Sequence, residues 1–365
     1  MKKDLIFRII VKVFCLTILL NIGGTLLADE YHWLGGTGNW GDINWRDQSN
    51  RDSPTNAPTS TDYARIGTYV TVGSSDITMD GNYMLSGSTQ AGVIIGDRQD
   101  VVLNIPTGTS LTSQGTIRID NRADEASIVT VNINGGTLCN TNTDYNLTLT
   151  DLNENDITTL NLISGTLNVG SGSILIGGAG SPGLATFNIS GGLLTSDNYY
   201  CDIAVYDTWN ISGGIISSMM GNTTIKAGGS VNIIGTNATI SLPAATRGWI
   251  FLESTSNLNY VFGVSGVTPI LTKRVYFFPG EIMNLSVDAA ALTDAKVGDD
   301  ILLIDYADYL LDYVVQEDSI SITDKINLTN ISTKIVGEMY NDLIEKKLYY
   351  RVTYVTPEGT VLLIK

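Results

Sequence analysis

Cysteine, proline, histidine and charged residues are all scarce in this chain. Its 365 residues include three cysteines, eight prolines and one histidine, and only 16% are Asp, Glu, Lys or Arg. A single histidine without paired cysteines excludes the usual zinc sites. Cys139 and Cys201 stand two repeats apart, farther than a disulfide reaches, so we expect two ordinary small core residues. The 38 glycines, with many Ser, Thr and Asn, favour strands and tight turns over helices.

Positive charge is also in short supply, and the formal net charge is −16. Repulsion from phosphate excludes nucleic acid as a partner and disfavours anionic membrane surfaces. A basic start followed by an apolar run over residues 13–27 is typical of a secretory signal peptide, here residues 1–28. The run is short for a membrane span, although an uncleaved anchor is the alternative. We expect a secreted or cell-envelope protein with no span in the mature chain.

One phrase recurs six times, with an asparagine between two apolar residues and glycine or threonine shortly after. The recurring asparagines are Asn104, Asn132, Asn161, Asn188, Asn210 and Asn232, at spacings of 28, 29, 27, 22 and 22 residues. Such a period marks a stacked repeat architecture. Equivalent asparagines of a parallel stack lie above one another, so their amides can hydrogen-bond along a structural ladder. The following glycines allow the positive φ that a sharp corner needs.

Each repeat contains short segments in which apolar and polar residues alternate. In one repeat these segments are ATFNIS from Ala185, LLTS from Leu193 and DIAVY from Asp202. Alternation with period 2 indicates half-buried strands, and stacked coils bury a continuous apolar column. The pattern predicts an all-β, right-handed parallel β-helix with three strands per coil over residues 69–242. Beyond Leu242 the phrase fades, so we expect residues 243–365 to form a β-rich C-terminal region that caps the helix.

The segment after the signal peptide is rich in tryptophan and glycine. Its distinctive residues are Trp33, Gly35, Gly36, Gly38, Trp40, Asn44 and Trp45, followed by Pro58, Asp62, Ala64 and Ile66. This pattern resembles the start of autotransporter-associated bacterial secreted β-helix proteins, and the later repeats resemble the pectate-lyase-like superfold in general pattern. The resemblance implies that residues 29–68 form an N-terminal cap. A tryptophan plug would cover the open end of a solenoid, although Trp33, Trp40 and Trp45 stacking on sugar rings is an alternative.

Catalytic groups are hard to find in the repeats. A β-helical polysaccharide lyase needs an Arg or Lys base near Ca²⁺-binding carboxylates, yet no Lys, Arg or His lies between Arg122 and Lys226. A glycoside hydrolase needs convergent carboxylates, and the tripeptide at residues 142–144 matches only one fragment of the polygalacturonase pattern. We therefore expect no catalytic site. A lyase or hydrolase acting on acidic polysaccharide is the alternative.

Acidic insertions in two successive repeats are the one candidate cation site. Insertions in successive repeats map to one face, and stacked carboxylates repel unless a cation joins them. The oxygen-bearing residues are Asp124, Glu125, Asp151, Asn153, Glu154, Asn155 and Asp156. They suit Ca²⁺, the only cofactor that the sequence suggests, although a solvated acidic edge that prevents strand aggregation is the simpler interpretation.

These observations predict a secreted or cell-surface protein with a structural or adhesin-like role. Its expected partner is an extracellular polysaccharide or a cell-surface glycan. The irregular parts of the chain, meaning the acidic insertions and the Trp-rich start, are better candidates for specific binding than the repeated asparagines are.

Overall fold

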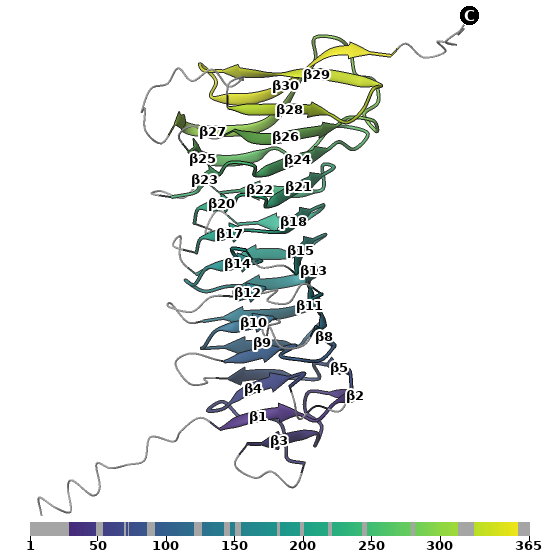
Figure 1. Cartoon of the computed structure of the whole chain (residues 1–365), viewed down its shortest axis with the longest axis vertical. Coiled ribbons are helices and arrows are strands. Elements are labelled where there is room, and N and C mark those ends of the chain that lie inside the picture. The colour runs from purple at the N-terminus through teal and green to yellow at the C-terminus, as the bar shows by residue number, and fades with distance from the viewer. Residues whose placement is uncertain are drawn as a thin grey trace, which may run out of the picture.

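The chain folds into a long stack of short β-strands (Figure 1). The computed structural model describes residues 29–48, 54–68, 71, 73–85, 92–119, 126–141, 147–149, 155–180, 183–197, 201–217, 221–242, 247–278, 282–312 and 325–356. In these ranges all regular structure is strand, so no helix long and apolar enough to cross a membrane occurs among them. The expected all-β class with parallel β-helical stacking is confirmed. The signal peptide expected over residues 1–28 lies outside the described residues.

Parallel pairing sorts the strands into three columns that run along the axis. The first column contains β2 (Gly36–Asn39), β5 (Ser75–Thr78), β8 (Val101–Pro106), β11 (Ile128–Asn140), β13 (Ile157–Asn168), β15 (Leu184–Ile189), β18 (Thr208–Ile211), β21 (Ser230–Ile234), β24 (Asn257–Val261), β26 (Met283–Asp288) and β28 (Ile326–Asn330). The second column contains β6 (Asn82–Leu85), β9 (Ser110–Ser113), the later halves of β11 and β13, β16 (Leu193–Thr195), β19 (Gly214–Ile216), β22 (Ala238–Ser241), β25 (Ile270–Phe277) and β27 (Asp300–Asp312).

The third column begins at the N-terminus and shares its last two strands with the second. It contains β1 (Glu30–Trp33), β4 (Tyr63–Ile66), β7 (Val93–Ile95), β10 (Ile117–Ile119), β12 (Leu147–Leu149), β14 (Ile174–Ile176), β17 (Ile203–Val205), β20 (Thr223–Ile225), β23 (Trp249–Leu252), β25 and β27. The handedness of the coil stays a prediction.

Alternation along each strand fills the interior. Successive side chains of a strand point to opposite faces, so every second residue enters the coil. In β15 the inward residues are Ala185, Phe187 and Ile189, all buried, while Asn188 points outward. The inward Phe187 stacks on Trp209 of the next coil, with ring centroids 6.1 Å apart and planes 4° from parallel. Each coil thus buries its apolar residues against its two neighbours, as a solenoid requires.

The two ends of the stack depart from purely parallel pairing. At the N-terminal end β3 (Trp45–Asp47) pairs antiparallel with β1. Parallel stacking continues past Leu242, the boundary expected from the sequence, because β24, β26 and β28 extend the first column. Only then do β29 (Ile335–Asp342) and β30 (Lys347–Val355) form an antiparallel pair, and β30 also pairs antiparallel with β27 (Figure 1). Phe262 and Tyr350 of β30 form a T-shaped ring pair with centroids 5.7 Å apart.

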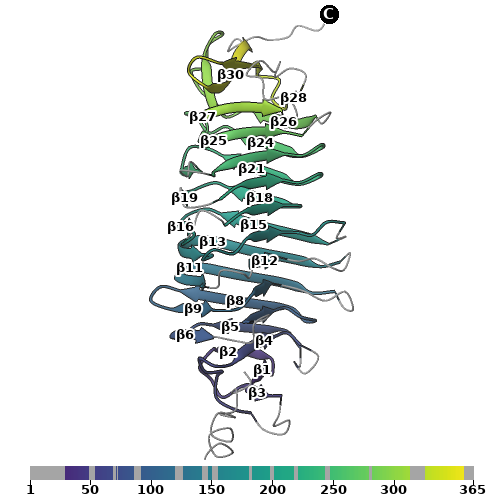
Figure 2. The same ribbon diagram turned by 90° about the vertical axis from the view of Figure 1, so that its left-hand side faces the viewer.

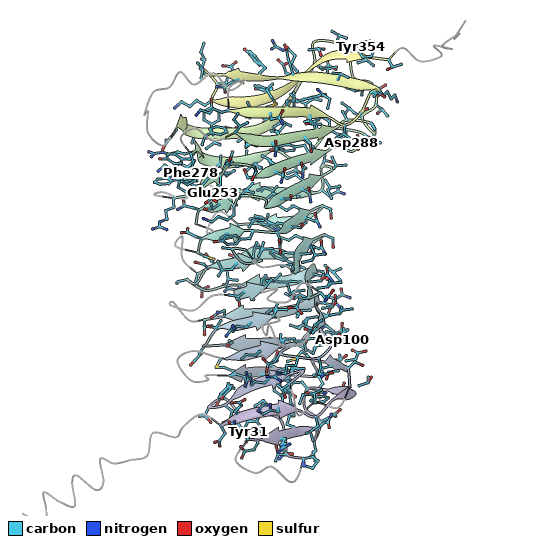
Figure 3. The ribbon with its side chains drawn as sticks, viewed as in Figure 1. Tyr31, Asp100, Glu253, Phe278, Asp288 and Tyr354 are labelled. Carbon is cyan, nitrogen blue, oxygen red and sulfur yellow. The ribbon has the colours of Figure 1, made fainter. Side chains whose placement is uncertain are left out.

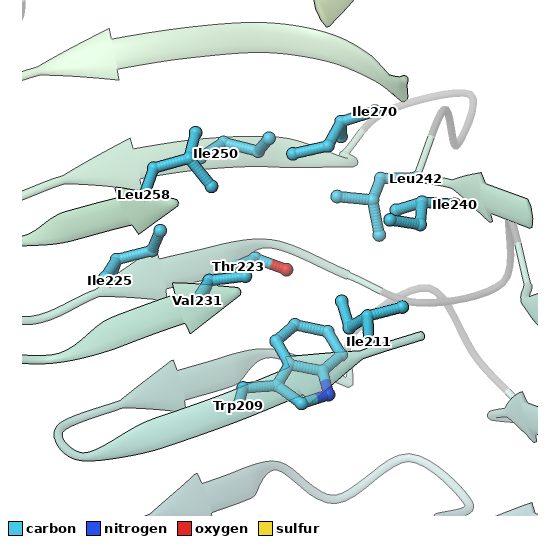
Figure 4. Close-up of a pocket in the computed structure, with 10 residues that line it drawn as sticks. All are labelled: Trp209, Ile211, Thr223, Ile225, Val231, Ile240, Leu242, Ile250, Leu258 and Ile270. Atoms are coloured by element: carbon cyan, nitrogen blue, oxygen red, sulfur yellow. The ribbon is translucent and has the colours of Figure 1, made fainter. Parts of the chain in front are cut away.

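A small cavity of about 20 Å³ lies inside the coil near β20 (Figure 4). Its walls are formed by apolar atoms, and Thr223 and Trp209 are among the lining residues. In the strands on either side, Ile203 and Ile250 pair with Thr223 in register, so a hydroxyl stands where its neighbours place an isoleucine. Among the described residues neither Thr223 Oγ1 nor Trp209 Nε1 has a hydrogen-bond partner. The core is therefore imperfect at this level.

Replacing Thr223 by valine should stabilise the fold. The change keeps the shape of the side chain and removes an unpaired buried hydroxyl, so we expect the free energy of unfolding to rise by about 1 kcal/mol. Urea denaturation would measure the shift of the midpoint at constant slope. Thr224→Val is the matched control, because Thr224 points outward and should change stability by less than about 0.5 kcal/mol. A destabilised Thr223→Val protein would contradict the expectation.

Candidate functional site

The six recurring asparagines form a continuous ladder on the outside of the first column. From Asn132 onward, each side-chain amide donates a hydrogen bond to the Oδ1 atom of the asparagine in the preceding coil. The N···O distances, from Asn132→Asn104 through Asn161→Asn132, Asn188→Asn161 and Asn210→Asn188 to Asn232→Asn210, are 2.9, 2.8, 2.8, 2.8 and 2.6 Å. Each amide has two N–H groups and an oxygen with two lone pairs, and among the described residues the ladder uses one of each, so one donor and one acceptor site remain.

The ladder is longer than the sequence phrase. Asn104 donates to Asp76 at 3.2 Å, Asn259 donates to Asn232 at 2.7 Å, and the hydroxyl of Ser286 donates to Asn259. A second, shorter ladder joins Asn284 to Asn257 at 3.2 Å and Asn327 to Asn284 at 3.1 Å. Asn259 stands between two apolar residues and Gly263 follows four positions later, the spacing of Asn104 and Gly108, so the phrase itself could have found this member. No glycine follows Asn284 or Asn327 closely, and there the alternating strand was the only signal.

The three N-terminal tryptophans are packed against one another. Trp45 lies 5.3 Å from Trp33 and 4.8 Å from Trp40 between ring centroids, and its indole nitrogen donates to the carbonyl of Trp40 at 2.8 Å. None of the three side chains has accessible surface. Their burial favours the core interpretation over stacking on a sugar, which stays a prediction.

Most of the acidic insertions lie outside the described residues. This applies to Asp124, Glu125, Asp151, Asn153 and Glu154, and only Asn155 and Asp156 can be placed. Asn155 is exposed, whereas Asp156 is buried and accepts a hydrogen bond from the backbone N–H of Ser127 at 3.0 Å. In the described part of the chain no three His, Cys, Asp or Glu side chains gather in a way that suits a metal ion. The Ca²⁺ site stays a prediction.

A buried ionic cluster near the N-terminus was not foreseen from the sequence. Glu30 and His32 of β1 lie beside Tyr63 and Arg65 of β4, because the parallel register pairs Glu30 with Tyr63 and His32 with Arg65. One oxygen of Glu30 is 2.8 Å from both His32 Nε2 and Arg65 Nη1, and Tyr63 donates to the other. Arg65 also contacts Asp97 at 3.3 Å. A cation is thus held between two buried carboxylates.

The protonation of this cluster suits structure better than acid–base chemistry. Burial alone would raise the pKa of Glu30, but hydrogen bonds from His32, Tyr63 and Arg65 lower the pKa to about 2. Burial and the hydrogen bond to Glu30 raise the pKa of Tyr63 above its ordinary value. At neutral pH Glu30 is therefore a fixed anion and Tyr63 a fixed donor. A general base works best when its pKa lies near the working pH, and neither group meets that condition.

Four aromatic rings in the described part of the chain form an outward-facing group on the third column. We call Trp249, Phe251, Tyr276 and Phe278 the aromatic ladder. Phe251 and Tyr276, which pair in register between β23 and β25, stack at 4.9 Å with planes 7° from parallel, and Trp249 lies 5.2 Å from Tyr276. Phe278 is 6.2 Å from Phe251. Tyr276 is buried and the other three are half-buried.

Polar groups border the aromatic ladder. The guanidinium of Arg274 lies 5.1 Å above the Trp249 ring, donates to Asp308 at 3.1 Å and donates to the Tyr276 hydroxyl at 3.2 Å. On the other side Lys226 forms an ion pair with Glu253 at 2.7 Å. Figure 3 labels Phe278 and Glu253 together at one margin of the molecule. The rings thus lie beside hydrogen-bonding groups of both charge signs, with Arg274 over one face of Trp249.

The two cysteines that can be placed are free thiols. Cys201 is buried and Cys139 half-buried, and no disulfide joins them. Burial raises the pKa of both thiols, so neither is a ready nucleophile.

Comparison with known proteins gives no relative for this chain. No protein-family model, curated protein or solved structure matches it at a significant level. The chain is thus described by its own geometry: a parallel β-helical stack with an asparagine ladder, a buried ionic cluster and an outward aromatic ladder.

Proposed function

We propose that the chain is an exported, adhesin-like β-helix that binds an uncharged glycan at the aromatic ladder. The observation behind the proposal is the outward row of Trp249, Phe251, Tyr276 and Phe278 beside Arg274 and Asp308. A sugar ring has an apolar face and a rim of hydroxyls. Tryptophan and tyrosine combine a large apolar ring with a polar handle, which suits such a ligand. A polar pair alongside can hydrogen-bond the hydroxyls.

The net charge restricts the glycan. At −16 the chain repels an acidic polymer, so a neutral chain is the better partner. Glu30 and Asp97 are buried and Arg65 is only partly exposed, and Arg65 already contacts both carboxylates, so the ionic cluster offers a polymer little to bind. We therefore place binding on the aromatic ladder and assign the cluster a structural role.

Export and the family resemblance belong to the same proposal. The basic and apolar start supports a signal peptide over residues 1–28, and the Trp- and Gly-rich segment supports kinship with secreted autotransporter-associated β-helices and a capping role for residues 29–68. Localisation of an epitope-tagged chain in culture supernatant, envelope and cytoplasm would test export. Retention of the tag in the cytoplasm would contradict this part of the proposal.

Loss of the Trp249 ring is expected to weaken glycan binding. After a glycan array identifies a neutral ligand, Trp249→Ala should lower the affinity by roughly 30-fold, or about 2 kcal/mol, as for a central aromatic contact. Calorimetric titration would measure the change, and circular dichroism would verify the fold. Tyr340→Ala is the matched control, since Tyr340 lies 3.8 Å beneath Arg351 much as Trp249 lies beneath Arg274.

Two results would overturn this function. One is a neutral-glycan affinity that Trp249→Ala leaves unchanged, or silence across the array. The other is release of unsaturated or reducing sugar ends from acidic polysaccharide by the purified chain, which would favour the lyase or hydrolase alternative.

A further inference from the structure

The outer face of the first column lacks charge over much of its length. The seven strands from β8 to β24 contain no Asp, Glu, Lys, Arg or His. Charge returns at its borders, at Asp76 of β5 and Asp288 of β26 along the axis, and at Asp100 and Asp207, which directly precede β8 and β18. Surfaces of soluble domains are usually about 25–35% charged, so an outer face without a single charge is unexpected. We call the outward residues of these seven strands the uncharged face.

The uncharged face is regular in two directions. Strands stack about 4.8 Å apart along the axis, and outward residues recur every two positions along a strand. Threonines at 130, 159, 186 and 208 form one row, and the asparagine ladder forms the next. Each amide in the ladder keeps one donor and one acceptor site for an external partner. Figure 2 shows these strands stacked above one another from β8 to β24.

Aliphatic side chains border the polar rows. Ile128, Ile157 and Leu184 pair side by side in consecutive coils and are 52%, 42% and 62% exposed. Ile163 and Ile234 are exposed near the other margin. Monomeric soluble proteins rarely expose contiguous apolar rows, and such rows usually mark an interaction site.

We propose that the uncharged face packs against the same face of a second copy of this chain. Two copies with a net charge of −16 each repel one another. On this face they can meet without bringing like charges together. Aliphatic margins exclude water, while the threonine hydroxyls and the free amide sites hydrogen-bond across the contact. A surface that pairs with itself gives a closed two-fold dimer.

The size of the face is sufficient for a dimer. Six inter-strand steps of about 4.8 Å span roughly 30 Å, and six residues of strand span roughly 20 Å. The face therefore covers on the order of 600 Å² in each copy, or about 1,200 Å² for the pair, which is the lower end of a standard stable interface. This inference is independent of the glycan site, because the aromatic ladder lies on the third column.

The test is the mass of the purified chain in solution. Sedimentation equilibrium should give twice the chain mass, and Leu184→Glu should weaken dimerisation by roughly a hundredfold, because a carboxylate would be buried in the contact. Ile215→Glu is the matched control: Ile215 is 50% exposed on the second column, so the dimer should persist. Circular dichroism should be unchanged in both variants, since both side chains point to solvent. A monomeric wild-type chain, or a dimer that Leu184→Glu leaves intact, would overturn the proposal.

Discussion

Glu30→Ala is expected to lower the free energy of unfolding by about 3–5 kcal/mol. The substitution removes the acceptor that Tyr63, Arg65 and His32 share, and leaves the Arg65 charge against Asp97 alone. Breaking a buried ion pair from one side costs this much because the remaining charge loses its partner without regaining water. Urea unfolding at neutral pH, followed by tryptophan fluorescence, suits the measurement because Trp33 and Trp45 lie in the same end of the stack.

The pH dependence separates the charge of Glu30 from its packing. Its pKa is lowered from 4.5 to about 2 in the folded chain. A lowered pKa adds stability above the unfolded value, and this stability is lost as the pH falls from about 5 towards 2. The wild-type chain should lose that increment on acidification, whereas Glu30→Gln should be less stable at pH 7 and change less on acidification. Equal acid sensitivity of the two proteins would show that other groups govern it.

An exposed pair provides the control for Glu30. Glu253 and Lys226 are 2.7 Å apart but partly solvated, so Glu253→Gln should cost less than about 1 kcal/mol. A comparable loss of unfolding free energy in the Glu30 and Glu253 variants would contradict the expectation that burial makes the Glu30 pair the more costly one to break.

Gly165→Ala should also destabilise the stack by about 3–5 kcal/mol. Gly165 has φ +88°, and a Cβ atom there would lie 2.2 Å from the carbonyl oxygen of Gly136 in the preceding coil. The strain of a positive φ adds about 1–2 kcal/mol, and the clash forces the corners of two coils apart. Thermal unfolding of the two proteins side by side measures the difference.

Gly108 separates the two causes. It has a similar φ of +82°, but nothing lies within 4 Å of its missing Cβ. Gly108→Ala therefore keeps the strain without the clash, and should cost only about 1 kcal/mol. Similar losses at both positions would show that close stacking of the corners is not what requires glycine at Gly165.

Local patterns in the sequence predicted most of the stack. Alternation in segments such as ATFNIS is a property of one strand, and its repetition at 22 to 29 residues indicates which strands stack. The extension past Leu242 was missed although β24 still fits the phrase, with Gly263 four residues after Asn259. Only β26 and β28 keep the alternation but lose the glycine. Alternation alone does not distinguish a further coil from a separate β-rich region.

The sites were harder to predict because they depend on register between coils. Glu30 meets Tyr63 and Arg65 across 33 and 35 residues, and no motif fixes how β1 aligns with β4. The aromatic ladder has the same origin. Phe251 and Tyr276 each lie in a short apolar segment, but the one-residue precision that brings their rings face to face appears only when β23 and β25 are aligned.

The asparagine ladder shows how the length of the molecule depends on its number of coils. A coil of 22 residues and a coil of 29 residues each add one asparagine to the ladder. The extra residues of the longer coil lie in the loops at the corners and not in the strands. Gaining or losing a whole coil would therefore change the length by about 4.8 Å. The cross-section, the apolar interior and the hydrogen bonding of the ladder would stay the same. The length of the protein is thus set by the number of coils, and it can change without any change at either end.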